Sequence, residues 1–272
     1  MPSSEQPSSR TPSSSTASNT PGGIPAAAPT PAAPTPAAPT PGESPELIWL
    51  RPERASRGPR PAHSRASIAA AAIVIADAEG LDAVSMRRVA AALGAGTMSL
   101  YNYVPKKEHL LDLMLDAVAG EYDYSGLTPT GDCRADLRRL AHEQLAALRR
   151  HPWVPALVIA RPGLGPNALR YTEHFLAVTE PSGLDGTARL EALALLTGFV
   201  CQFAQYERTA AAGAKWQADL AGYLGRAAAS GEFPHLAAAF ATTGAAADSP
   251  DAVFDRSLDR VITAALAPVG AA

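Results

Sequence analysis

Small polar, aromatic and basic side chains cluster between residues 85 and 107 of this 272-residue chain. The side chains able to do chemistry there are Arg87, Thr97, Met98, Ser99, Tyr101, Asn102, Tyr103 and Lys107. Hydroxyl and amide groups can hydrogen-bond the edges of bases, a methionine can contact a thymine methyl group, and basic or phenolic groups can hold phosphates. The chemistry predicted for this segment is therefore recognition of nucleic acid.

The sequence patterns that would indicate catalysis or a bound metal are missing. No Gly-x-Ser-x-Gly, Gly-x-x-x-x-Gly-Lys or His-Glu-x-x-His pattern occurs, and Gly163-Leu164-Gly165 is too short for a phosphate loop. Cys133 and Cys201 are too far apart to suggest a zinc knuckle or a disulfide framework. We therefore expect no catalytic residue, no cofactor and no metal. An enzyme with a catalytic helical body is the alternative from another functional class.

The charge of the chain changes sign along its length. The net charge is −3, but residues 51–107 hold nine basic and four acidic residues (+5), whereas residues 108–272 hold 13 basic and 19 acidic residues (−6). This split predicts that only the basic segment meets a polyanion. No stretch reaches the roughly 18 apolar residues of a membrane helix, and the N-terminus lacks the features of a signal peptide. We expect a cytoplasmic protein with no membrane partner.

Helices, and no strand, are predicted beyond residue 64, because Ala is abundant and apolar residues recur three and four positions apart. The expected helices cover about 64–78, 86–93, 97–103, 106–122, 134–151, 153–160, 166–180, 186–212, 216–229 and 250–267. Ser85 suits an N-cap, Ala90 is small where two helices must approach, and Gly94 permits the positive φ that ends a helix. These features predict a helix-turn-helix with Leu93, Leu100 and Val104 on its inner face.

Several motifs of the chain follow the pattern of one known family. The motifs in the first half are Ser-Met-Arg-Arg-Val-Ala at 85–90, Leu-Gly at 93–94, Met-Ser-Leu-Tyr-Asn-Tyr-Val at 98–104, Lys107-Glu108 and Leu-Leu-Asp-Leu-Met at 110–114. Those in the second half are His151-Pro152-Trp153 and the stretches 161–169 and 254–261. Over residues 62–268 the chain resembles the TetR family of bacterial transcriptional repressors, in the branch whose C-terminal domain is similar to that of the tetracycline repressor.

The resemblance implies an all-α fold of two domains. Residues 62–122 would form an N-terminal three-helix helix-turn-helix DNA-binding domain, and residues 123–272 a helical C-terminal domain for ligand binding and dimerisation. Residues 1–45 would precede them as a disordered tail, because they are nearly all Pro, Ala, Ser and Thr and hold 12 of the 25 prolines. Residues 46–61 would form a basic linker, either solvated or acting as an arm that touches phosphates or the minor groove.

The resemblance also implies two groups of DNA contacts. Thr97, Met98, Ser99, Asn102 and Tyr103 would approach base edges, while Arg87, Tyr101 and Lys107 would hold phosphates. Met98 offers only apolar contact, and Asn102 stands where the best-known member has a bulky aromatic residue, so the operator sequence cannot be borrowed. The alternatives are that Tyr101 and Tyr103 are hydrophobic cover between helices and that Arg87 is a solvated helix charge.

For the second domain the resemblance implies a small-molecule effector cavity and a homodimer. The side chains expected at the cavity are His142, His174, Phe199, Gln202, Phe203 and Tyr206. The helix 186–212 is apolar nearly all round, which predicts burial on both sides. It would pair with the last helix and their copies, and the dimer would place two helices in successive major grooves of a palindromic double-stranded operator. The alternatives are ordinary core or surface positions for the six residues, and a constitutive or partner-regulated DNA binder without an effector.

Overall fold

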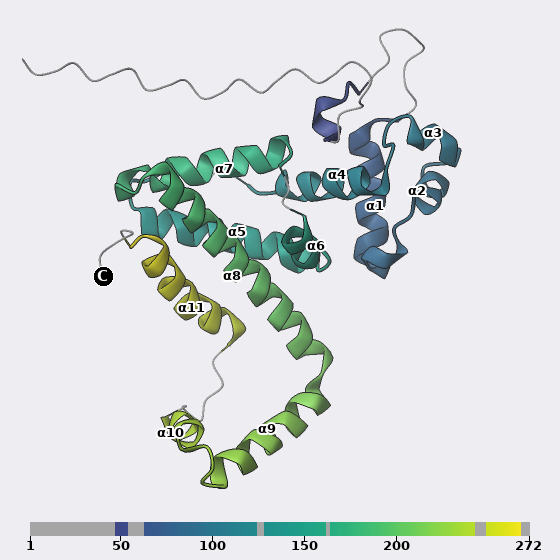
Figure 1. Ribbon diagram of the computed structural model, residues 1–272. Coiled ribbons are helices and arrows are strands. Elements are labelled where there is room, and N and C mark those ends of the chain that lie inside the picture. Colours follow the sequence, from purple (N-terminus) through teal and green to yellow (C-terminus); the bar gives the residue numbers. More distant parts are fainter. Residues whose placement is uncertain (1–46, 54–62, 124–127, 162–163, 243–248, 268–272) are drawn as a thin grey trace, which may run out of the picture. The chain divides into compact units, whose positions relative to one another are not determined.

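The computed structural model describes residues 47–53, 63–123, 128–161, 164–242 and 249–267, and within these ranges it contains helices and no strand (Figure 1). The predicted all-α fold class is therefore confirmed. Contacts divide the chain into two units, Met1–Glu43 and Ser44–Ala272, and every described residue belongs to the second. The tail predicted for residues 1–45 lies outside the described residues, as do residues 54–61 of the predicted linker.

The helix-turn-helix lies in a group of four helices that we call the head. They are α1 (Arg65–Glu79), α2 (Met86–Ala92), α3 (Thr97–Tyr101) and α4 (Lys107–Ala119). Ser64 and Ser85 cap α1 and α2, because each hydroxyl accepts a backbone N–H three residues further on. Gly80 at φ +86° ends α1 and Gly94 at φ +63° follows α2, both in the left-handed region that favours glycine. The predicted cap and turn are confirmed.

The five-residue helix α3 depends on the core of the head. A helix of this length has no stability of its own in water. Leu100 and Val104 are fully buried and belong to one hydrophobic core with Ile68, Val89 and Leu110 of the neighbouring helices. This burial fixes α3 and turns its opposite side outward.

A turn of 3-10 helix, η1 (Ile48–Leu50), precedes α1 and joins the same core. The Ile48 side chain is 0% exposed. The guanidinium of Arg65 donates hydrogen bonds to the carbonyl oxygens of Ile48 at 3.1 Å, Arg51 at 2.9 Å and Tyr103 at 3.2 Å. Residues 47–53, which fall in the segment expected to be a linker, are therefore bonded to the head.

The remaining helices, which we call the body, follow in the second half of the chain. They are α5 (Cys133–Arg150), α6 (Val154–Ala160), α7 (Pro166–Thr179), α8 (Gly186–Ala212), α9 (Ala214–Ala229), α10 (Pro234–Thr242) and α11 (Pro250–Ala265), with a 3-10 turn, η3 (Glu180–Ser182), after α7. The sequence predicted about six helices here and missed α10. This helix has nine residues and lies between Gly231 and Gly244, two positions where the sequence predicts breaks, and nine residues are too few for a clear period.

The long helix α8 packs against α5, α6, α7 and α11. Phe254 of α11 is fully buried, and its ring lies 5.5 Å from the ring of Phe199 and 5.0 Å from that of Phe203 on α8. Leu195 and Tyr206 on α8 are 45% and 63% exposed. The chain's own described helices do not cover these two side chains, so burial of α8 on both sides stays a prediction that depends on the dimer.

Candidate DNA interface and effector pocket

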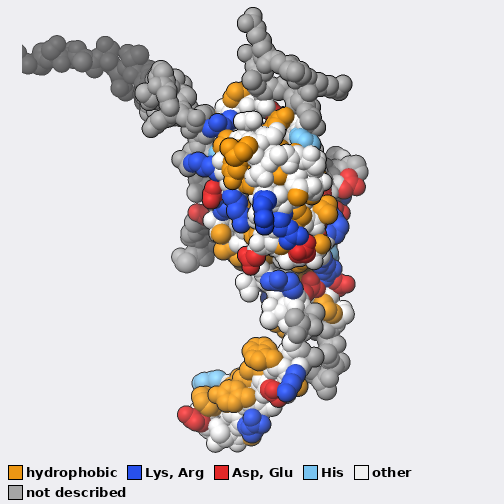
Figure 2. All heavy atoms as spheres, turned by 90° about the vertical axis from the view of Figure 1, so that its right-hand side faces the viewer, with side chains coloured by type: hydrophobic (Ala, Val, Ile, Leu, Met, Phe, Trp, Pro, Cys, Tyr) orange, Lys and Arg blue, Asp and Glu red, His pale blue; other side chains and the backbone are white. Residues whose placement is uncertain are grey.

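The outer surface of the helix-turn-helix carries most of the side chains predicted to read bases. Met98 is 77% exposed, and Ser99 and Asn102 are also exposed, while Thr97 in the first turn of α3 is half-buried. Tyr103 is half-buried and packs against the core of the head, which is the position that hydrophobic cover would take. Figure 2 views the side that carries α2 and α3, and shows Lys and Arg side chains gathered there among hydrophobic ones.

Basic and phenolic side chains flank this surface. Arg87 of α2 and Lys107 at the start of α4 are exposed, and Tyr101 is 40% exposed. The neighbouring Arg88 instead forms an ion pair with Glu79 of α1, and its hydrogen bond lowers the pKa of Glu79. The N-terminus of α4 adds the positive end of a helix dipole beside Lys107. Arg87, Tyr101 and Lys107 are thus placed where phosphates could approach.

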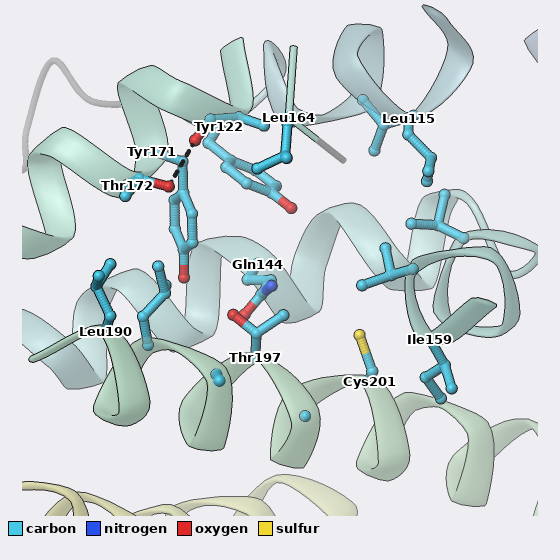
Figure 3. A pocket seen from close by; sticks show the side chains of 18 residues that line it. Leu115, Tyr122, Gln144, Ile159, Leu164, Tyr171, Thr172, Leu190, Thr197 and Cys201 are labelled. Atoms are coloured by element: carbon cyan, nitrogen blue, oxygen red, sulfur yellow. Dashed lines mark hydrogen bonds between the residues drawn. The ribbon is translucent and has the colours of Figure 1, made fainter. Parts of the chain in front are cut away.

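A cavity of about 420 Å³ lies between α4, α5, α6, α7 and α8 (Figure 3). Its volume is in the range of small-molecule pockets, roughly 300–1,000 Å³. The large apolar side chains that line it are Leu115, Val118, Val154, Val158, Ile159, Leu164, Leu190 and Leu193. The polar ones are Tyr122, Gln144, Tyr171, Thr172, Thr197 and Cys201. None of the 18 lining residues is acidic, basic or a histidine.

Four polar side chains lie near one another in the cavity, with Leu164 and Leu190 on the same side, while Cys201 lies toward Ile159. In Figure 3, Tyr122 and Tyr171 face Gln144 and Thr197, whereas Ile159 and Leu115 lie at the other end. The rings of Tyr122 and Tyr171 meet edge to face, with 5.2 Å between their centres. Burial raises the pKa of Cys201 to about 11, so this group is a neutral thiol at pH 7.

Three of the side chains predicted at the cavity belong instead to the contact between α5, α8 and α11. Phe199 and Phe203 pack on Phe254, as described above. His142 is exposed on α5, and its Nε2 lies 2.8 Å from Oδ1 of Asp255 on α11.

The other three predicted effector residues also lie away from the lining. Gln202 and Tyr206 are exposed on α8, and His174 is half-buried on α7. None of the six predicted residues is among those that line the cavity. Their part in effector binding stays a prediction, and the cavity offers a different set of side chains.

Gln144 is one of six polar lining residues that sequence reasoning missed. It is 4% exposed, and its Oε1 has no hydrogen-bond partner in the described part of the chain. Its neighbours on the inner face of α5 are the buried residues Leu137, Leu140, Ala141, Leu145 and Leu148. The available signal was a glutamine among apolar residues on one face of an amphipathic helix.

Helix α4 belongs both to the core of the head and to the wall of the cavity. Leu110 near its start is in the head core, and Leu115 and Val118 line the cavity. Asp116 on the same helix accepts the backbone N–H groups of Asn167 at 2.9 Å and Ala168 at 3.0 Å, at the start of α7. Burial raises the pKa of Asp116, although these hydrogen bonds oppose the shift. A displacement of α4 must therefore involve α7 as well.

A second junction joins α1 to the segment between α5 and α6. The Nε1 of Trp153 donates to Oδ1 of Asp77 on α1 at 2.7 Å, and Nδ1 of His151 lies 2.8 Å from the same oxygen. The Nε2 of His151 lies 3.0 Å from Oε2 of Glu121, just beyond α4. Val154, the next residue after Trp153, lines the cavity. The cavity wall is thus bonded to two parts of the head.

Two family models match the chain, one over most of the head and one over the body. The model of the tetracyclin repressor-like C-terminal domain matches residues 125–265, which is more than half of the chain. The model of bacterial regulatory proteins of the tetR family matches residues 68–114. The chain belongs to the TetR family. It is accordingly a DNA-binding transcriptional regulator, and the resemblance noted in its sequence is confirmed.

Two relatives of this TetR-family chain are named as regulators. The HTH-type transcriptional repressor DrrR1 of Streptomyces coeruleorubidus is 43% identical over 201 residues, which cover 71% of this chain and 74% of the relative. An HTH-type transcriptional regulator of Saccharopolyspora erythraea is 36% identical over 157 residues, covering 58% of this chain and 66% of the relative.

Solved structures of the TetR family protein ActR from Streptomyces coelicolor share the fold. The apo form has a TM-score of 0.64 and 28% identity, covering 76% of this chain and 97% of ActR. The complex of ActR with actinorhodin also has a TM-score of 0.64 and 28% identity, covering 75% and 95%. The similarity therefore extends over nearly the whole of ActR.

Two further findings concern membranes and metals. Among the described helices, none has both the length and the apolar composition needed to cross a bilayer. In the same residues, no group of three or more His, Cys, Asp or Glu side chains is arranged to hold a metal ion.

Proposed function

We propose that this TetR-family protein is a repressor that binds its operator as a dimer and releases it when a small molecule fills the cavity. The observation that carries the proposal is the double role of α4, whose Leu110 lies in the head core while Leu115 and Val118 line the cavity. A ligand that binds better to one position of α4 would shift the population of head positions. Operator binding and ligand binding would then be coupled reciprocally.

On DNA, we propose that α3 enters the major groove. The base contacts would come from α3 and the two residues after it: Thr97, Met98, Ser99, Asn102 and Tyr103. The phosphate contacts would come from Arg87 on α2, Tyr101 on α3 and Lys107 on α4. The exposure of Met98 and the freedom of the α3 surface from core packing support this assignment. Tyr103 would reach DNA only with the exposed part of its ring, since the rest packs on the core.

The proposed dimer pairs α8 and α11 with their copies. Leu195 and Tyr206 support it, because they are large side chains left 45% and 63% exposed on a helix that packs against four others. Two-fold symmetry would set the two α3 helices about 34–36 Å apart, so the operator would be palindromic. The site of action would be the cytoplasm, where the operator is.

The relatives support both halves of the proposal. DrrR1 is named a transcriptional repressor, and ActR has been solved with actinorhodin bound. By likeness to them, we assign repression and small-molecule release to this chain.

A gel-shift titration on the DNA that flanks the protein's own gene tests the operator half. We expect salt-sensitive binding to a palindrome there, and at least tenfold weaker binding by the doubly substituted variant Arg87→Ala/Lys107→Ala. Absence of binding to any palindrome by folded wild-type protein would contradict repression. Circular dichroism establishes that both proteins are folded.

A thermal-shift screen tests the effector half. We expect a compound that stabilises the protein also to release the operator in the gel shift. If every stabilising compound leaves the operator bound, release by a small molecule is wrong, while operator binding itself is unaffected.

A further inference from the structure

We infer that the effector is an uncharged, largely apolar molecule that donates a hydrogen bond to Oε1 of Gln144. The inference rests on the proposed function for the identity of the site, and names the chemical class of the effector. It depends on the charge of the lining, on one buried acceptor and on the place of that acceptor in the cavity.

The lining of the cavity, in the described part of the chain, contains no group that could balance an ionised ligand. All 18 lining residues are uncharged, and the raised pKa of Cys201 keeps its thiol protonated at pH 7. Asp116, on the face of α4 turned toward α7, is occupied by the N–H groups of Asn167 and Ala168. A carboxylate or an ammonium group placed beside the buried Gln144 would lose its hydration and gain no counter-charge. The cavity therefore favours neutral molecules.

Gln144 supplies an acceptor that needs a donor. Its side chain is 4% exposed, and Oε1 has no partner in the described residues, although a buried amide oxygen is normally hydrogen-bonded. In Figure 3 the amide lies between Tyr171 and Thr197, on the cavity side of α5. Oε1 is itself buried, so the amide must turn toward the cavity to accept a hydroxyl or N–H group of a ligand, whereas a ligand with acceptors alone would leave it unsatisfied.

The remaining lining predicts where the donor sits on the ligand. Leu115 and Ile159 lie away from Gln144, toward the other end of the cavity. The hydroxyl of Thr172 already donates to the carbonyl oxygen of Ala168 at 3.0 Å, so toward a ligand it can only accept. A hydrocarbon body with a hydroxyl or N–H group at one end matches this arrangement.

A set of fluorescent pyrenes separates charge from hydrogen-bond donation. The probes are 1-hydroxypyrene, 1-methoxypyrene, 1-pyrenecarboxylate and 1-pyrenemethylammonium, titrated into the full-length protein at pH 7. They share one apolar body, and only the first is both neutral and a donor. We expect 1-hydroxypyrene to bind about tenfold more tightly than 1-methoxypyrene, in line with a hydrogen bond to a buried acceptor, and at least tenfold more tightly than either ion.

Variants of Gln144 test the assigned atom. Gln144→Leu removes the acceptor and keeps a similar volume, so the preference for 1-hydroxypyrene over 1-methoxypyrene should fall to about twofold or less, since the hydrogen bond is lost. Gln217→Leu, on α9 and outside the lining, is the matched control and should keep the tenfold preference. Gln144→Met serves in the same way if the leucine variant does not fold, as judged by circular dichroism.

Several outcomes would overturn the inference. They are equal binding of 1-hydroxypyrene and 1-methoxypyrene by the wild type, binding of either ion as tight as that of 1-hydroxypyrene, survival of the preference in Gln144→Leu, or no binding by any of the four. Operator release is measured separately by gel shift. Binding of 1-hydroxypyrene without release would contradict the proposed function alone, and release by a charged compound would contradict the ligand class alone.

Discussion

At the scale of single residues, Gly165 shows how closely the head and the body approach. It directly precedes α7, and a Cβ added there would lie 2.2 Å from Oδ1 of Asp116 and 2.6 Å from the ring of Trp49. Asp116 cannot withdraw freely, because the same oxygen accepts the N–H groups of Asn167 and Ala168. The glycine is thus required by lack of space, since its φ of −77° suits any residue.

We predict that Gly165→Ala destabilises the protein by about 1–3 kcal/mol, as overpacking of a tight contact does. Urea unfolding followed by circular dichroism measures the change. Gly198→Ala on α8 is the control, because its added Cβ meets no atom within 4 Å and a helical glycine is expected to cost about 0.5–1 kcal/mol relative to alanine. An unchanged midpoint for Gly165→Ala would show that α7 can move away from α4.

Among the site residues, prediction from the sequence succeeded where a local motif determined position. Met98, Ser99 and Asn102 were expected to face outward, and they do, because Leu100 between them is drawn into the core. Gln144 was not foreseen as a cavity residue. Its position depends on five helices meeting around it, and neither its own helix nor its neighbours in sequence encode that meeting.

At the scale of elements, helix ends were predictable where a cap or a glycine marks them. α8 begins and ends at the predicted residues, with the side chain of Asp185 accepting the N–H of Ala188 at its start. η1 had only an apolar cluster as its signal. The bonds that hold it come from Arg65, which reaches carbonyl oxygens 14, 17 and 38 residues away in the sequence. Hydrogen bonds between residues so far apart in the sequence leave no periodic pattern of residue types.

Paired truncations test whether η1 is part of the head. Removal of residues 1–43 leaves every contact described above intact, so we predict an unchanged free energy of unfolding. Removal of residues 1–53 uncovers the core beside Ile48 and takes away the Ile48 and Arg51 carbonyls to which Arg65 donates, so we predict a further loss of about 2–5 kcal/mol, the usual cost of deleting a buried isoleucine side chain. Urea unfolding of the two shortened chains measures the difference. Equal free energies of unfolding for the two shortened chains would mean that η1 does not stabilise the head.

At the scale of the whole molecule, the basic segment of the chain carries the helix-turn-helix and the acidic segment carries the cavity. Residues 51–107, with nine basic and four acidic residues, include the helix-turn-helix, and residues 108–272, with 13 basic and 19 acidic residues, include the cavity. An acidic body disfavours contact of the body with DNA, which leaves the head as the surface that meets phosphates. The small net charge of the chain therefore results from a basic segment and an acidic one, which suits a regulator with two sites.

The salt dependence of operator binding reports the number of phosphate contacts, and it therefore tests both the basic head and the dimer. Each phosphate contact contributes about 0.9 to the slope of log K against log salt concentration. We predict that Arg87→Ala and Lys107→Ala each reduce the magnitude of the slope by about 2, because a dimer loses two contacts per substitution. Binding should also weaken to a similar degree on operator and on unrelated DNA, since phosphates carry no sequence.

Arg226→Ala, exposed on α9 of the acidic body, is the control and should leave the slope unchanged. A reduction of about 1 would indicate that one protomer binds alone, and no reduction would mean that these side chains do not reach the backbone of the DNA.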